Sequence, residues 1–215
     1  MIDSRIFGHL WSTPESHSIF DEDARVRRWV DVLIALAQSQ AEIGLIPTKA
    51  AEEIAELAQC DLPIESIAEA TRTTGHSTLG LIQVLQGLLS PVAAPFVYYG
   101  ATVQDITDTS QVLELAATGA LLWRDLRIIE DRLLGLAVTH RTTPMAGRTH
   151  GQLGSPIPLG FKMASWADQI GRDLSRLDDG RERWLTGQFG GAVGTLGFFG
   201  GEGLPLRQDF CRRLG

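Results

Sequence analysis

The chain has 215 residues and a formal net charge of −7, and it is 44% hydrophobic and 21% charged, which is the composition of an ordinary globular protein. The acidic balance and the absence of any run of five basic residues argue against a nucleic-acid partner. Charges interrupt every apolar stretch well before 18 residues, so we expect no membrane span. All but two of the 19 basic residues are arginine, which favours a small anionic substrate. Two isolated cysteines and a start without signal-peptide features indicate a cytoplasmic protein.

The first strong helical pattern follows Asp21. This residue is a good N-cap, and Glu22 and Asp23 in the first turn favour the helix dipole. Gly44 and Pro47 are expected to end the helix. Between these limits, apolar or small residues recur at a spacing of three to four: Val26, Trp29, Val30, Leu33, Ala37 and Gln40/Ala41.

Three shorter helices are predicted next. One follows Thr48, one has Pro63 at its first position, and one is capped by Ser77 and stopped by Pro91. The positions expected to face inward are Ile54, Leu57, Ala58, Ile64, Ile67, Ala68, Leu81, Ile82, Leu85, Leu88 and Leu89.

Two long helices are predicted over residues 105–140 and 156–185, and the first corresponds to a rod of roughly 50 Å. It carries apolar residues on more than one stripe, so we expect several neighbours and oligomerisation through long helices. We predict no strands. A glycine-rich stretch over residues 187–203 lacks the lysine of a phosphate loop and is interpreted as close backbone packing, with the option that some N–H groups face an anion. A further helical pattern begins at residue 206.

Three polar, glycine-bearing loops separate these helices, over residues 73–78, 99–109 and 147–152. The last contains His150 between two glycines and beside Thr149, and an unperturbed imidazole can give or take a proton near neutral pH. His76 offers a second imidazole, and Thr, Ser and Gln donors in the loops could hold a carboxylate. The two histidines lie far apart in the sequence and lack a carboxylate at ligand spacing, so we expect no metal.

Two of these segments, G-A-T-x-Q-D-I-x-D-T and G-R-T-H-G-Q, resemble the adenylosuccinate lyase branch of the fumarase/aspartase superfamily. The resemblance extends from A-E-I-G-L-I-P at residues 41–47 to G-G-A-V-G-T at residues 190–195. It implies an all-α homotetramer built on a bundle of long helices, with active sites that draw loops from three chains. We therefore expect an N-terminal helical domain over residues 1–100 and an incomplete long-helix bundle domain over residues 101–215.

The resemblance also implies a reaction, an anti β-elimination that needs no cofactor and releases fumarate from a succinyl-type polycarboxylate. His150 would be the general acid, and His76 would orient it or share in the proton transfer. Asp105 would hold its loop and cap the long helix. The residues assigned to substrate binding are Thr102, Gln104, Thr149, Ser77, Arg148 and Gln152.

Some positions depart from the adenylosuccinate pattern. Val103 replaces the usual serine after G-A-T, and the opening residues look more like those of carboxymuconate cycloisomerases. The serine-loop motif G-S-S-x-M-P-x-K-x-N-P, which carries the catalytic base in this superfamily, does not occur in the 215 residues. We therefore expect a truncated chain that is inactive alone. Two alternatives remain open, a carboxymuconate cycloisomerase and a non-catalytic helical oligomerisation fragment.

Overall fold

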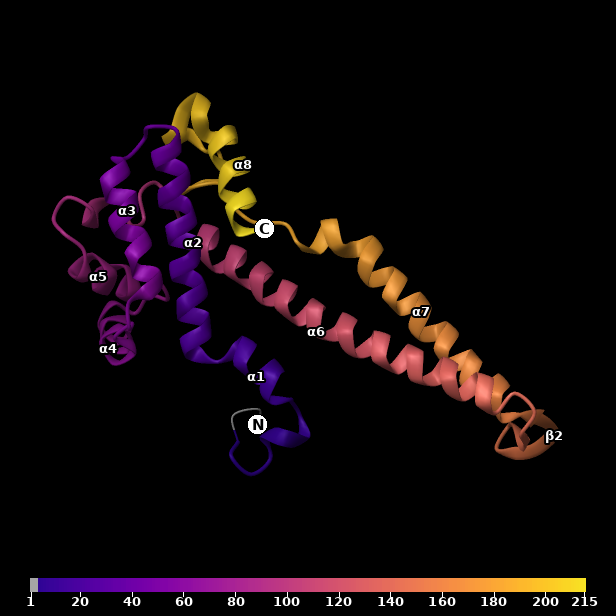
Figure 1. Cartoon of the computed structure of the whole chain (residues 1–215). Helices are drawn as coiled ribbons and strands as arrows, with labels where there is room; N and C mark the ends of the chain where they lie inside the picture. The colour runs from indigo at the N-terminus through magenta and orange to yellow at the C-terminus, as the bar shows by residue number, and fades with distance from the viewer. Residues whose placement is uncertain (1–3) are drawn as a thin grey trace. The chain divides into compact units, whose positions relative to one another are not determined.

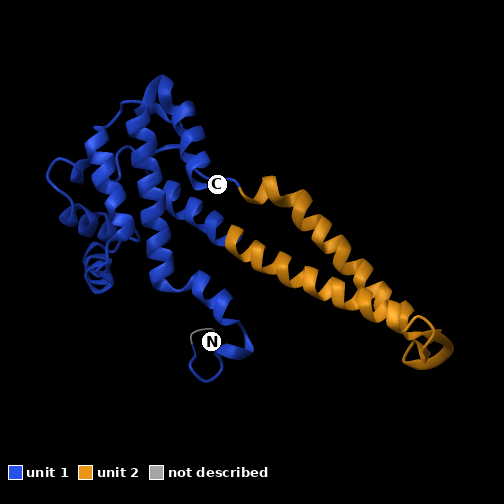
Figure 2. Ribbon diagram, in the orientation of Figure 1, with its two compact units in different colours: residues 1–115, 186–215 blue, residues 116–185 orange. Residues whose placement is uncertain are grey.

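A computed structural model describes residues 4–215 (Figure 1). Helices dominate the described residues, which confirms the predicted all-α class. The chain forms two compact units (Figure 2): unit 1 comprises residues 1–115 and 186–215, and unit 2 comprises residues 116–185. The predicted division into a helical domain over residues 1–100 and a bundle domain over residues 101–215 stays a prediction.

Unit 1 is built around α2, which spans Glu22–Glu42. Asp21 caps this helix as predicted, because its carboxylate accepts a hydrogen bond of 2.7 Å from the Ala24 amide. The predicted inward face is also confirmed, since Val30, Leu33 and Ala37 are fully buried. The other helices of unit 1 are α1 (Pro14–Phe20), α3 (Thr48–Glu56), α4 (Ile64–Thr74), α5 (Leu79–Leu88) and α8 (Gly203–Leu214), with short 3₁₀ helices η1 (Gly8–Leu10), η2 (Leu57–Gln59), η3 (Ala94–Phe96) and η4 (Gly197–Glu202).

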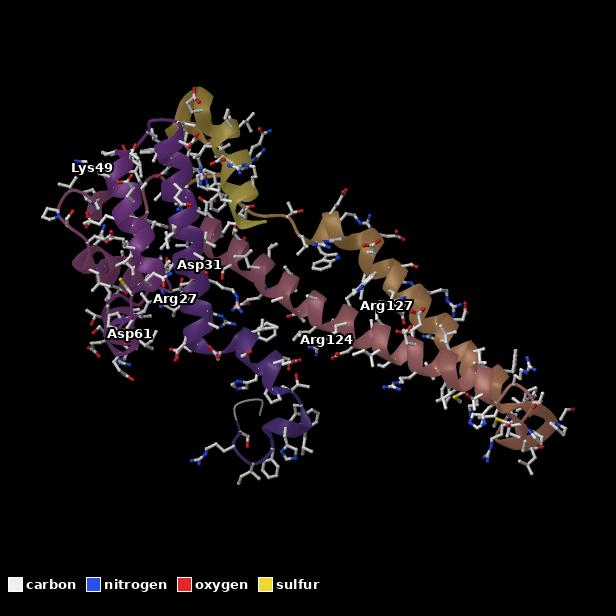
Figure 3. All side chains as sticks on the ribbon, in the orientation of Figure 1. Arg27, Asp31, Lys49, Asp61, Arg124 and Arg127 are labelled. Carbon is white, nitrogen blue, oxygen red and sulfur yellow. The ribbon has the colours of Figure 1, made fainter. Side chains whose placement is uncertain are left out.

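Polar contacts fix the helices around α2. Arg27 of α2 (Figure 3) donates to the carbonyls of Leu57 at 2.8 Å and Cys60 at 2.6 Å, and so holds the end of α3 and η2. Glu53 of α3 accepts hydrogen bonds from the backbone and side chain of Ser90, which lower the pKa of this carboxyl. These bonds satisfy backbone groups in the connections, where no helix ladder can do so.

The helices α4 and α5 agree with the sequence patterns, with two corrections. Pro63 is the N-cap of α4 rather than its first residue. Leu88 was expected to face inward but is 49% exposed, because α5 ends there and the chain turns away into residues 89–102. The inward positions Leu81, Ile82 and Leu85 are buried as predicted.

Both long helices are present, as α6 (Val103–Thr139) and α7 (Leu159–Trp184). The prediction that the chain has no strands was wrong: β1 (Pro144–Thr149) and β2 (Gln152–Pro158) form an antiparallel hairpin between these helices. Consequently α7 begins three residues later than expected. Helices α6 and α7 run antiparallel within unit 2 (Figure 1), and a side chain at Gly160 would come within 2.4 Å of the Ala137 carbonyl.

Candidate functional site

His150 lies at the tip of the hairpin in unit 2. Thr149 pairs with Gln152, which leaves His150 and Gly151 as a two-residue turn with φ values of 51° and 75°. Such a turn requires positive φ at both central residues, a conformation that histidine tolerates better than most non-glycine residues. The imidazole is therefore presented to solvent at the end of a hydrogen-bonded hairpin, and Thr149 and Gln152 flank it, both exposed.

Gly147 controls how the hairpin approaches its turn. The strand register shifts between Ala146 and Arg148, and a Cβ atom at Gly147 would lie 2.4 Å from the Ser155 carbonyl oxygen. Only glycine fits at this bulge. Beyond it, Arg148 pairs with Leu153, and the guanidinium side chain is exposed on the same hairpin as His150.

His76 lies in unit 1 and caps α5. Its Nδ1 accepts hydrogen bonds from the amides of Thr78 at 3.3 Å and Leu79 at 3.1 Å. The prediction that Ser77 caps this helix was wrong, because the ring nitrogen reaches the same first-turn N–H groups. Accepting at Nδ1 places the proton of the neutral ring on Nε2, so His76 presents a donor away from the helix. Ser77 is exposed beside it.

The start of α6 carries Thr102 and Gln104, and a buried carboxylate organises it. Asp105 is fully buried and accepts from the Thr102 amide at 2.9 Å, which caps the helix as predicted. The same carboxylate accepts from the amides of Gly190 at 2.7 Å and Gly191 at 3.0 Å. Gln104 is exposed and Thr102 is half-buried, so both are accessible at the positive end of a long helix, where a carboxylate is favoured.

The expected close packing holds for part of the glycine-rich segment, whereas a Cβ at Gly194, Gly200 or Gly201 would meet open space. A Cβ at Gly203 would lie 2.7 Å from that of Leu196, and one at Gly100 would lie 2.5 Å from the Phe198 ring. The amides of Gly190 and Gly191 donate to the Asp105 carboxylate. The anion that this pair of N–H groups faces is therefore a side chain of the protein itself.

Further contacts hold the loop before α6 and the segment that follows α7. The buried Gln40 of α2 donates from Nε2 to the Tyr99 carbonyl at 2.6 Å. The Thr109 hydroxyl donates to the Gln188 carbonyl and accepts from the Gln188 amide, at 2.7 and 2.9 Å. Burial and the neighbouring Asp105 carboxylate raise the pKa of Tyr98 to about 12, so its phenol stays protonated.

The predicted site residues fall into three groups. Unit 1 contains the group at the start of α6 and the group between α4 and α5, and unit 2 contains the hairpin group. Sequence reasoning missed the partners of Asp105 on the glycine-rich segment, and also Glu114, which is buried and pairs with Arg25 at 3.2 Å. An acidic residue within a run of apolar helix positions is the only signal that pointed to Glu114.

Among the described residues 4–215, no group of three or more His, Cys, Asp or Glu side chains is placed to hold a metal ion. In the same residues, no helix is both long and apolar enough to cross a bilayer.

Comparisons with known proteins agree with this architecture. Residues 11–201 match the model of a family described as lyase. The chain is 40% identical over 210 residues to N-acetyl-S-(2-succino)cysteine lyase of Enterococcus italicus, covering 97% of this chain and 46% of that protein. It is 38% identical over 206 residues to adenylosuccinate lyase of Methanothermobacter thermautotrophicus, covering 95% of this chain and 46% of that protein.

Among solved structures, β-carboxy-cis,cis-muconate cycloisomerase from Acinetobacter calcoaceticus superposes with a TM-score of 0.91 at 32% identity, covering 98% of this chain and 50% of that one. The fold is thus that of the helical fumarase/aspartase enzymes. The chain belongs to the lyase family within that superfamily. It spans about half the length of the curated relatives it matches.

Proposed function

We propose that this chain supplies the amino-terminal half of a lyase that releases fumarate from a succinyl-type polycarboxylate by anti β-elimination. The observation that carries the proposal is the two-residue turn that exposes His150 at the end of a hairpin, within the G-R-T-H-G-Q motif. A solvent-exposed imidazole on a rigid hairpin can reach into a site that other elements complete.

The proposed reaction assigns one role to each group. A base removes a proton from the carbon next to a substrate carboxylate, and that electron pair forms the C=C bond. The bond to the leaving nitrogen, oxygen or sulfur then breaks, and the leaving atom keeps its electron pair and takes a proton from His150. His76 orients this transfer through Nε2–H.

Substrate carboxylates are held at the start of α6 and on the hairpin. Asp105 fixes the first turn of α6, so Thr102 and Gln104 are presented without rearrangement. Thr149, Arg148, Gln152 and Ser77 add donors, all of them exposed. Preorganised donors stabilise the developing negative charge of the carboxylate more than mobile ones do.

The leaving group is where the relatives differ, because their names specify a succinylated thiol and a succinylated purine amine. We propose that the complete enzyme containing this chain catalyses a cofactor-free elimination that breaks a C–N, C–O or C–S bond. The base is expected on a serine loop whose motif is absent from these 215 residues, so the polypeptide alone should not turn over.

We also propose a homotetramer assembled through long helices. Unit 2 exposes many large apolar side chains on α6 and α7, which isolated helices in water do not favour. They are Leu122, Trp123, Ile128, Ile129, Leu134, Leu136, Val138, Phe161 and Trp166. Light scattering coupled to size exclusion tests this, and a compact monomer would contradict it.

A cycloisomerase is the second candidate, favoured by the TM-score of 0.91 to a carboxymuconate cycloisomerase. A substrate screen on the complete polypeptide that the gene encodes separates the two. Elimination splits adenylosuccinate, argininosuccinate or an S-succinylated thiol and releases fumarate, whereas cycloisomerisation converts carboxymuconate to a lactone of the same mass. Failure of every substrate would favour a non-catalytic helical oligomerisation module.

A further inference from the structure

Unit 1 contains a cavity of about 660 Å³, and of its lining residues only Ser77 has a role in the function proposed above. It lies between the end of α1, the first turns of α2, α4 and the residue Ser77. Its volume is within the range of about 300–1,000 Å³ that is typical of small-molecule sites.

The walls of this cavity are fixed by contacts outside it. Arg28 of α2 donates to the Ile19 carbonyl, which joins the end of α1 to α2. Helices α4 and α5 are in close contact because residue 80 is glycine: a Cβ there would lie 2.5 Å from the Thr71 amide nitrogen. These contacts hold α1 against α2 and α4 against α5, so a ligand would have less of the lining to order.

The lining combines aromatic and apolar surface with polar groups. Phe20 and Trp29 line it together with Ile67 of α4, and Thr71 and Ser77 contribute hydroxyls. Aromatic faces of this kind bind flat rings and attract cations.

The charges that line the cavity are unbalanced. Asp21 and Glu22 are acidic, and Arg25 and His17 are the basic residues of the lining. The Asp21 carboxylate also accepts from the Ala24 amide as the cap of α2. The Arg25 guanidinium already pairs with the buried Glu114 at 3.2 Å, so its charge is offset there. A phosphate or carboxylate would meet two carboxylates and no uncommitted guanidinium, whereas an uncharged or cationic group would meet complementary acceptors.

The cavity lies next to a residue of the proposed reaction. Ser77 lines it, and the preceding residue is His76, whose ring is held by the amides of Thr78 and Leu79. We propose that this cavity binds an uncharged or cationic aromatic group, and that this group is part of the leaving group of the substrate. The link to the leaving group rests on the proposed function, whereas the binding of the aromatic group does not.

Ligand-observed NMR on the 215-residue chain tests the binding with three probes that share a phenyl ring: 2-phenylethanol, 2-phenylethylamine and phenyl phosphate. The alcohol and the amine should bind, and phenyl phosphate should bind at least tenfold more weakly. Ala68→Trp fills the cavity from α4 and should weaken the first two probes at least tenfold. The matched control Ser66→Trp adds the same side chain on the exposed side of α4 and should leave binding unchanged.

A second variant covers the case in which Ala68→Trp does not fold. Phe20 is 45% exposed, so Phe20→Ala spares the core and should weaken the aromatic probes about fivefold through the lost ring contact. Equal binding of all three probes, or binding by Ala68→Trp or Phe20→Ala equal to that of the parent chain, would overturn the assignment of the cavity.

Kinetics of the complete enzyme test the link to the leaving group. On N-substituted aspartates, Ala68→Trp should lower kcat/KM at least tenfold for a phenylethylamine leaving group and leave it unchanged for methylamine. Equal losses for both would remove the cavity from leaving-group recognition. No elimination of either by the parent enzyme would count against the proposed function, and the NMR result would still decide the cavity.

Discussion

Replacing Asp105 with alanine should release the glycine-rich segment from the start of α6. The Asp105 carboxylate is fully buried and accepts three backbone hydrogen bonds, from Thr102, Gly190 and Gly191, at 2.7–3.0 Å. Alanine offers no acceptor, so these N–H groups lose their partner at once. The two glycine amides are buried, and water cannot replace the carboxylate there without local opening.

The magnitude follows from those bonds. An unsatisfied buried N–H costs about 1–3 kcal/mol, and Thr102 is half-buried and can be rehydrated, so Asp105→Ala should destabilise unit 1 by about 3–5 kcal/mol. Asp105→Asn keeps one oxygen that can serve Thr102 and Gly191, but its amide group then faces the Gly190 N–H. That variant should lose only about 1–2 kcal/mol.

Urea unfolding measures the total loss, and hydrogen exchange at the Gly190 and Gly191 amides measures the local one. Both amides should lose protection in Asp105→Ala and keep part of it in Asp105→Asn. Unchanged protection, or a loss below about 1 kcal/mol in the alanine variant, would refute the view that this carboxylate holds the segment.

Three other outcomes are expected. In the complete enzyme, His150→Asn preserves the positive-φ turn but removes the imidazole and should lower kcat about 10²–10⁴-fold, and an unchanged kcat would exclude a general acid at this position. Gly100→Ala should lower the free energy of unfolding in urea by about 2–4 kcal/mol, because its Cβ meets the Phe198 ring at 2.5 Å. The control Gly44→Ala has a similar φ but lies in open space, and it should lose about 1 kcal/mol. Equal losses in the two variants would contradict the packing argument. Burial acts to raise the pKa of Asp209, but hydrogen bonds from the two arginines that follow it on α8 dominate and lower the pKa to about 2. Because the folded pKa lies below the ordinary 3.8, the stabilisation is present above about pH 4 and is lost as the pH falls toward 2. Asp209→Asn should therefore show a smaller drop in urea midpoint than the parent chain over that range.

The helices of this chain were readable from the sequence because their signals are local. The Asp21 cap and the spacing of apolar residues fixed α2 to within one residue at its start. The long helices were recognised for the same reason, since no proline interrupts residues 105–139.

The hairpin was missed because its strands lack the usual signal. Its residues include three prolines and three glycines, and nearly all of them are exposed, so no alternation of polar and apolar positions marks a buried face. What defines it is the two-residue turn at His150 and the bulge at Gly147, and both depend on backbone geometry rather than on side-chain pattern.

The residues of the candidate site were predictable from the sequence, but most of the hydrogen bonds that hold them in place were not. The role of Asp105 as a helix cap follows from its place three residues after Thr102, but its bonds to Gly190 and Gly191 join positions more than 80 residues apart in sequence. The capping of α5 by His76 instead of Ser77 likewise depends on a rotamer that the sequence does not specify.

The product formed by the complete enzyme tests the central claim most directly. Proton NMR of reactions with N- and S-succinylated substrates should show the vinyl signal of fumarate appearing together with the free amine or thiol, and His150→Asn should suppress both. A lactone of unchanged mass formed from carboxymuconate, without fumarate from any succinylated substrate, would contradict the account.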